Sequence, residues 1–183
     1  MKKVIVFLAD GFEEVEALTT VDPLRRVNAN VITMSIANDI VVCGAHDIIV
    51  NTDSVFDKGE LEDADAIVLP GGMPGTLNLK NHRGVEDTVL DFVKTGKLVC
   101  AICAAPMILG ELGLLKGKKA CCYPGMEEYL KEAVVESGPV SVDGNIITGV
   151  GVGGAIAFAL EIVKYLFDEE TAKELKESIV DKF

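Results

Sequence analysis

The residues of this chain that are best placed to do chemistry lie around one cysteine. Residues 97–102 form an apolar run typical of a buried strand, and Cys103 follows it directly. A helix-like stretch begins at Pro106, so the chain must turn sharply at the cysteine. The N–H groups and dipole at a helix start favour a thiolate. We therefore predict a reactive Cys103 at a nucleophile elbow; the alternative is a small buried hydrophobe, as many free cysteines are.

An acidic segment near the N-terminus supplies a candidate partner for this thiol. Glu13, Glu14 and Glu16 follow the apolar run of residues 3–8 and open an apolar helical pattern. Glu13 and Glu14 need only complement the helix dipole. Glu16 borders the apolar stripe, so we expect it to be partly buried. Desolvation and a neighbouring thiolate would raise its pKa, and the protonated carboxyl would then donate a hydrogen bond to the sulfur.

Two glycine-rich segments also follow expected strands. Residues 70–75 contain Gly71 and Gly72, whose backbone N–H groups could form an anion pocket in the manner of an oxyanion hole; the alternative is an ordinary tight turn. Residues 149–154 formally fit the glycine pattern of dinucleotide-binding sites. We reject that interpretation because too few residues follow for another strand with an acidic ribose ligand. We expect these glycines to let a helix pack closely on the sheet.

Strand and helix patterns alternate along the chain, which predicts an α/β fold with a mostly parallel sheet and helices on both faces. The expected strands are 3–8, 30–37, 64–69, 97–102, 118–123, 139–142 and 145–150, and the expected helices are 13–28, about 85–95, 106–115, 153–167 and one after Asp168. Residues 39–50 resemble a hairpin or short edge strands, and residues 53–62 an acidic loop. Without a linker or repeat, residues 1–183 are expected to form a single domain. The strand-to-helix junctions should meet at one edge of the sheet.

Composition excludes several classes of function. The net charge of −12 over 183 residues disfavours nucleic acid and anionic membranes as partners. The apolar runs are too short to span a bilayer, and the first is interpreted as a strand, so we expect a cytoplasmic protein. Five cysteines in such a chain do not suggest a disulfide framework, and Cys100 and Cys103 should point to opposite faces of their strand. With only His46 and His82 available, we expect no metal site and no cofactor.

Three motifs together, at residues 10–16, 68–72 and 101–106, resemble the DJ-1/ThiJ/PfpI superfamily, and the resemblance follows nearly the whole chain in order. It is closest to the DJ-1-like branch, and it implies a flavodoxin-like three-layer sandwich that forms a homodimer. It also implies that Cys103 is an oxidation-sensitive nucleophile and that Glu16 is the acid hydrogen-bonded to it. By the same resemblance, the backbone amides of Gly72 and Ala104 face the thiolate and any sulfinate oxygens.

Two departures from the superfamily pattern bear on function. DJ-1-type proteins often carry a histidine before a proline where this chain has Tyr123 and Pro124. Members of the PfpI protease type carry a histidine directly after the cysteine, where this chain has Ala104. A Cys-His peptidase would therefore lack its general base. Tyr123 is a possible auxiliary hydrogen-bond donor, although a phenol is a poor base near pH 7.

The sequence thus favours a protein of oxidative or carbonyl stress defence. The first hypothesis is a redox sensor or chaperone-like protein in which peroxide oxidises the Cys103 thiolate. The alternative, suggested by the resemblance, is a glyoxalase III-like or deglycase enzyme that acts on methylglyoxal and its early adducts through Cys103 and Glu16. An intracellular cysteine peptidase ranks below both.

Overall fold

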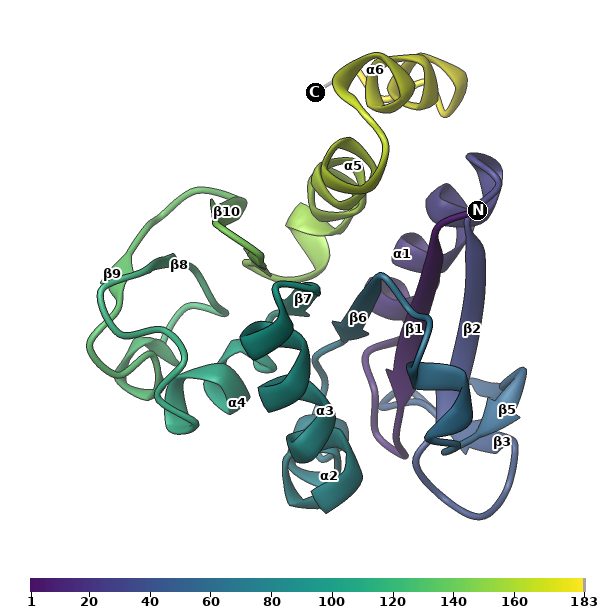
Figure 1. Ribbon diagram of the computed structural model, residues 1–183, viewed down its shortest axis with the longest axis vertical. Helices are drawn as coiled ribbons and strands as arrows, with labels where there is room; N and C mark the ends of the chain where they lie inside the picture. The colour runs from purple at the N-terminus through teal and green to yellow at the C-terminus, as the bar shows by residue number, and fades with distance from the viewer. Residues whose placement is uncertain (183) are drawn as a thin grey trace.

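The computed structural model describes residues 1–182 and is built around a seven-stranded sheet with the order β10-β11-β7-β6-β1-β2-β5 (Figure 1). Its strands are β1 (Lys3–Leu8), β2 (Asn30–Ser35), β5 (Ser54–Val55), β6 (Ala66–Leu69), β7 (Leu98–Ile102), β10 (Val140–Asp143) and β11 (Ile146–Gly149). All neighbouring strands are parallel except β10 and β11, which form an antiparallel hairpin. The predicted α/β fold with a mostly parallel sheet is confirmed.

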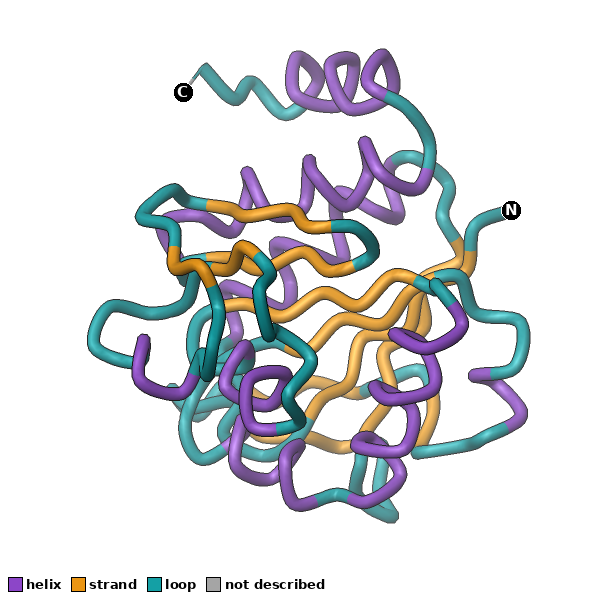
Figure 2. Tube along the Cα trace, turned by 60° about the vertical axis from the view of Figure 1, so that its left-hand side comes forward, coloured by secondary structure: helices purple, strands orange, loops and turns teal. Residues whose placement is uncertain are grey.

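Helices cover both faces of the sheet (Figure 2). The helices on one face are α1 (Glu14–Arg26), α5 (Ala155–Leu166) and α6 (Glu169–Ser178), and those on the other are α2 (Gly75–Asn81), α3 (Arg83–Thr95) and α4 (Pro106–Glu111). Helix α6 packs mainly on α5, on the side away from the strands (Figure 1). The result is a three-layer arrangement of helices, sheet and helices.

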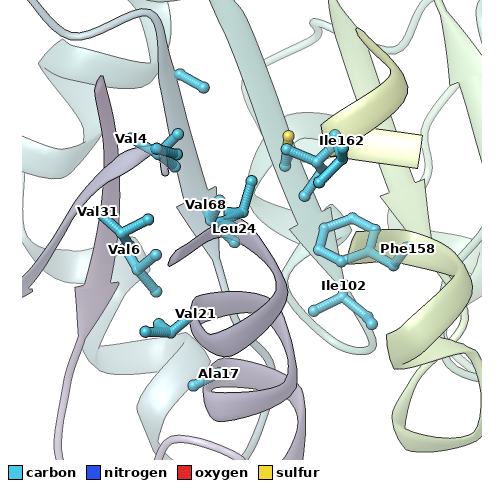
Figure 3. Close-up of a cluster of buried hydrophobic side chains, with 14 of the residues drawn as sticks. Val4, Val6, Ala17, Val21, Leu24, Val31, Val68, Ile102, Phe158 and Ile162 are labelled. Carbon is cyan, nitrogen blue, oxygen red and sulfur yellow. The ribbon is translucent and has the colours of Figure 1, made fainter. Parts of the chain in front are cut away.

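The core consists of two clusters of buried side chains, one on each face of the sheet. In β1, Val4 and Val6 belong to the cluster beneath α1 and α5, whereas Ile5 and Phe7 belong to the cluster on the other face. This alternation follows from the two-residue period of a strand. Because both faces of β1 are covered, its sequence is a continuous apolar run rather than an alternating one. Figure 3 shows part of the first cluster, where Phe158 of α5 is one of the buried side chains.

Several short elements complete the fold. Strands β3 (Val41–Cys43) and β4 (Ile49–Asn51) form an antiparallel hairpin, as one of the two interpretations of residues 39–50 predicted. Strands β8 (Lys119–Ala120) and β9 (Val134–Val135) form a small parallel pair. The 3-10 helices are η1 (Gly59–Leu61), η2 (Glu127–Tyr129) and η3 (Val152–Gly154).

Some boundaries predicted from the sequence were wrong. Helix α2 was not predicted because residues 70–75 are rich in glycine and proline; the helix nevertheless starts at Gly75. Strand β5 lies within the segment expected to be a loop, and it pairs with the end of β2. Helix α4 ends at Glu111 rather than near residue 115. The strand expected at 118–123 is reduced to the two residues of β8.

The buried face of α1 also differs from the predicted one. The helical spacing of Phe12, Val15, Leu18, Val21, Leu24 and Val27 in the sequence predicts that Val15 and Leu18 lie on its apolar stripe, but they are 47% and 43% exposed. Ala17, Val21 and Leu24 are the apolar residues that α1 packs into the core. The helix is therefore rotated about its axis relative to the predicted stripe, and this rotation buries polar residues of its first turns.

One prediction about the cysteines is wrong. Cys100 and Cys103 were expected on opposite faces of their strand, but both lie at the cluster beneath α1 and α5, because β7 ends at Ile102 and Cys103 leaves the strand with a positive φ. All five cysteines are free thiols. Within residues 1–182, no helix combines the length and the apolar character needed to cross a bilayer.

The close packing of α5 on the sheet can be tested at Gly149. A Cβ atom there would lie 2.9 Å from Ile102 Cγ1 and 2.9 Å from Phe158 Cδ2, closer than real contacts allow. Gly149→Ala is therefore expected to lower the free energy of unfolding by about 1–3 kcal/mol through overpacking. Gly153→Ala is the matched control, because a Cβ there meets nothing within 4 Å. Urea denaturation measures both; equal midpoints would contradict the packing argument.

Candidate active site at the carboxyl edge of the sheet

Cys103 lies directly beyond the end of β7, at the turn into α4. Its φ of 64° is in the left-handed region, which is strained for a residue with a side chain. Two hydrogen bonds hold this conformation. The Cys103 N–H donates to the Gly149 carbonyl at 2.9 Å, and the Cys103 carbonyl accepts from the Tyr123 N–H at 2.8 Å. The cysteine is thus fixed by the neighbouring strand β11 on one side and by the segment after β8 on the other.

Glu16, in the first turn of α1, is completely buried. Its Oε2 atom accepts a hydrogen bond from the Gly71 N–H at 2.9 Å. Its Oε1 atom has no hydrogen-bond partner among residues 1–182. The Cys103 thiol, the Gly71 N–H and the Val152 N–H lie near enough to lower the carboxyl's pKa, but burial outweighs them and raises the pKa of Glu16 to about 7. The sequence predicted this direction, although it predicted only partial burial.

Glycine at position 71 allows the acid and the thiol to meet. A Cβ atom on Gly71 would lie 2.5 Å from Cys103 Cβ and 2.6 Å from Glu16 Oε2. No other residue fits between the two side chains without displacing one of them. The sequence identified Gly71 only as a member of a pair of candidate anion-binding amides, whereas its N–H is used on the carboxyl.

Gly72 connects the junction after β6 to the junction after β1. Its φ is 91°, and a Cβ on it would lie 2.4 Å from the Glu13 nitrogen and 2.5 Å from the Gly11 oxygen. The Glu13 N–H donates to the Gly71 carbonyl at 2.9 Å, which closes the contact between the two segments. This close approach of two backbones fixes α1, and with it Glu16, against the loop after β6.

The electrostatics of the thiol differ from the prediction. Burial, followed by the charge and the hydrogen bond of Glu16, raises the pKa of Cys103 to about 12. The N–H groups of Ala104 and Gly72 lower it, but by less. Because the two acids face each other, ionisation of one opposes ionisation of the other. The pair therefore loses its first proton near pH 7, and that proton leaves Glu16. The Glu16 carboxylate can then accept the thiol proton, which gives a thiolate beside a protonated acid.

The structure brings the predicted site residues to one place and adds Gly151 to them. Cys103, Glu16 and the amides of Gly72 and Ala104 interact directly. The Tyr123 side chain, 53% exposed, lies at the outer side of the site. Gly151 was missed, because residues 149–154 were interpreted as helix-packing glycines; that interpretation holds for Gly149 only.

Glu14 has a role beyond the expected interaction with the helix dipole. It is 3% exposed and accepts hydrogen bonds from the His46 backbone N–H at 2.7 Å and from His46 Nδ1 at 2.8 Å. Burial raises the pKa of Glu14, but the hydrogen bonds from His46 and from the backbone lower it below its usual range. The hydrogen bond that His46 donates to Glu14 correspondingly raises the pKa of His46. This pair joins the turn between β3 and β4 to the start of α1.

Comparison with known proteins extends the resemblance of the three motifs to the whole chain. The DJ-1/PfpI family profile matches residues 2–165. The chain is 38% identical to Protein DJ-1 homolog B of Arabidopsis thaliana over 98% of its length, but it spans only 41% of that relative. It is 32% identical to a deglycase of Pyrococcus abyssi, with 90% of this chain and 99% of that protein covered. The solved structure of oxidized Toxoplasma gondii DJ-1 has a TM-score of 0.95 at 33% identity, with both chains fully covered.

Burial of Glu16 predicts a pH dependence of stability. Folding raises the pKa of this carboxyl from 4.5 to about 7, so the folded state binds the proton more tightly. The free energy of unfolding should therefore fall by about 3 kcal/mol as the pH rises through this interval. Glu16→Gln removes the titrating group. The variant should gain stability relative to the wild type as the pH rises from 4.5 to 8.

Urea denaturation at several pH values measures this difference. Glu174→Gln, a change at an exposed position of α6, serves as the control and should follow the wild-type curve. Parallel curves for Glu16→Gln and the wild type would mean that the Glu16 pKa is not raised by folding.

Proposed function

Because this chain belongs to the DJ-1/PfpI family, we propose that it is a cofactor-independent glyoxalase- or deglycase-type enzyme that acts on methylglyoxal and its early adducts through Cys103 and Glu16. The observation that carries this proposal is the buried Glu16 carboxyl, with a pKa of about 7, directly beside the thiol. A group with a pKa near the working pH both donates and accepts protons efficiently. Relatives named as deglycases, which this chain covers over nearly their full length, support the substrate class.

The first half of the reaction is addition to the aldehyde. The Cys103 thiolate attacks the aldehyde carbon and forms a C–S bond, while the carbonyl electron pair moves to oxygen and takes the Glu16 proton. The product is a hemithioacetal, and Glu16 is left as a carboxylate. The N–H groups of Gly72 and Ala104, which lower the pKa of Cys103, stabilise the attacking thiolate.

The second half is an internal rearrangement followed by hydrolysis. The Glu16 carboxylate removes the proton from the former aldehyde carbon and returns it to the adjacent carbon, while the hydroxyl proton passes from the first oxygen to the second. The hemithioacetal thereby becomes a thioester. Water then adds to the thioester carbonyl and breaks the C–S bond, which releases lactate and regenerates Cys103. Methylglyoxal and water balance lactic acid, so no oxidant is required.

The positions of the two histidines give peptide hydrolysis no support. His46 hydrogen-bonds to Glu14. His82 accepts the Val85 N–H at the start of α3, and its ring lies against Phe56. Each imidazole therefore makes contacts away from Cys103, and the thiol has Glu16 as its acid-base partner.

A peroxide-sensing thiol is the second candidate, favoured by the two N–H groups that interact with the Cys103 sulfur. They are suited to hold the oxygens of a sulfenic or sulfinic acid after peroxide has oxidised the thiolate. A structural relative is named as oxidized. A reducing, cytoplasmic location, which the five free cysteines favour, would keep Cys103 reduced until peroxide arrives. This role ranks second because the raised pKa of Cys103 lowers the fraction of thiolate, the form that peroxide oxidises.

We also propose that the chain forms a homodimer through α1. Val15 and Leu18 are exposed on this helix, and a cavity of about 510 Å³ beside Leu18 is lined by Ile156 and Ile179. Leu18→Glu is expected to shift the mass measured by light scattering from dimer to monomer, because it places a charge in an apolar contact. Leu77→Glu, at a position of α2 with similar exposure, is the control. A Leu18→Glu protein that stays dimeric would exclude this face.

The enzymatic proposal predicts the behaviour of three variants in thiol-free buffer with methylglyoxal. Cys103→Ser should abolish lactate formation measured by NMR. Glu16→Gln should lower kcat by about 10²–10⁴-fold, the usual contribution of general acid-base catalysis. Cys43→Ser, a change at another partly exposed cysteine, should leave the rate unchanged.

Absence of lactate with every protein, the wild type included, would refute the enzymatic role. Peptide mass spectrometry after dilute peroxide would then decide on the sensor. Oxidation of Cys103 before Cys43, Cys100, Cys121 and Cys122 would support it, and earlier oxidation of another cysteine would exclude Cys103 as the sensing thiol.

A further inference from the structure

Gly151, two residues beyond the end of β11, faces the thiol and the acid from the side opposite Gly71. A Cβ atom on Gly151 would lie 3.5 Å from Tyr123 Cδ2, 3.6 Å from Glu16 Oε1 and 3.8 Å from Cys103 Sγ. These are ordinary contact distances, so one atom fits at this point without displacing its neighbours. We call this volume the Gly151 space.

Other glycines of the same segment do not face the site. A Cβ on Gly149 would meet Ile102 and Phe158 of the core, and one on Gly154 would lie 2.9 Å from the Pro139 carbonyl. Gly153 has open surroundings. The contact with catalytic groups is therefore a property of Gly151 and not of a glycine-rich loop in general.

A buried polar atom points to what fills the Gly151 space. Glu16 Oε1 is completely buried and has no hydrogen-bond partner within residues 1–182. Such an atom costs about 1–3 kcal/mol unless a partner is supplied. An oxygen atom placed about 0.7 Å from the Gly151 Cβ position toward Oε1 would lie about 2.9 Å from it and form that hydrogen bond. A ligand oxygen at this point would therefore give Oε1 a hydrogen-bond partner.

The same point is also at a suitable distance from the sulfur for a carbonyl group that reacts with it. It lies 3.8 Å from Cys103 Sγ, so a carbonyl oxygen there has its carbon within reach of the thiolate. Protonated Glu16 can then donate to this oxygen as the C–S bond forms. The Tyr123 ring borders the space on its outer side, where the remainder of the substrate must pass.

We propose that Gly151 is a specificity-determining residue: the absence of its side chain leaves the space in which the carbonyl oxygen of the substrate binds to Glu16 Oε1. This inference rests on the proposed function and deepens it. The substrates it admits are small aldehydes whose remaining chain is slender enough to leave past Tyr123, such as methylglyoxal. An aromatic aldehyde such as phenylglyoxal meets the Tyr123 ring.

Reversible protection of the thiol tests the proposal without requiring turnover. Acrylonitrile, which carries no oxygen, alkylates Cys103, and peptide mass spectrometry gives the rate. Added methylglyoxal slows this alkylation by forming the hemithioacetal, and the concentration for half protection reports aldehyde binding. In Gly151→Ala this concentration should rise at least about tenfold, while alkylation without aldehyde stays within about threefold of the wild type. Gly153→Ala, the matched control, should behave as the wild type does.

Each outcome separates the Gly151 space from the proposed function. Unchanged protection by methylglyoxal in Gly151→Ala would overturn the proposal for the Gly151 space. An equal fall of the alkylation rate and of the protection would also overturn it, because the added methyl would then merely obstruct the sulfur. Protection that depends on Gly151 in a wild-type protein that produces no lactate would refute the enzymatic role and leave the binding site intact.

The φ of 142° at Gly151 strains any alanine placed there, so a second variant covers the case in which Gly151→Ala does not fold. Tyr123→Ala removes the outer wall of the space. It should lower the half-protecting concentration of phenylglyoxal at least about fivefold, and that of methylglyoxal by less than about twofold. An unchanged preference between the two aldehydes would overturn the proposal.

Discussion

The site depends on one hydrogen bond and on the residue that donates it. The Gly71 N–H holds Glu16 Oε2 at 2.9 Å, and the missing side chain of Gly71 leaves the gap in which the carboxyl meets Cys103. Gly72 adds the backbone contact with Gly11 and Glu13 that fixes the start of α1. The two glycines therefore set the distance between the Glu16 carboxyl and the Cys103 thiol, on which the other interactions of the site depend.

This arrangement differs from the Cys-His pair of a cysteine protease. Burial raises the pKa values of both Glu16 and Cys103 and so favours the protonated form of each group. A Cys-His pair instead forms two opposite charges, a thiolate and an imidazolium. A shared proton suits reactions in which one oxygen of the substrate must gain a proton while the sulfur adds to carbon. Amide hydrolysis instead needs a base that can later protonate a departing amine. The absence of histidine at Ala104 fits this division.

Most of the fold could be predicted because parallel strands covered on both faces are continuous apolar runs. The corner at Cys103 was visible for the same reason, since the run ends abruptly before Pro106. The buried face of α1 was not predictable from periodicity, because Glu16 is buried for interactions with Gly71 and Cys103 that lie far away in the sequence. The raised pKa of the thiol was not predictable either. The amides at the start of a helix can be recognised in the local sequence, whereas the burial that outweighs them is a property of the folded molecule. Glycine patterns do not reveal which glycine faces a reactive group.

The strand order also has a consequence for how the protein is made. Cys103 is synthesised well before Gly151, and the parallel pairing of β11 with β7 is required to bring the two together. Chains fold from the N-terminus as they emerge, and parallel pairing between distant segments forms late. A nascent chain therefore carries Cys103 on an edge that β11 has not yet covered. Shielding of this thiol marks completion of the sheet, and an interrupted chain would be recognisable by its unprotected cysteine.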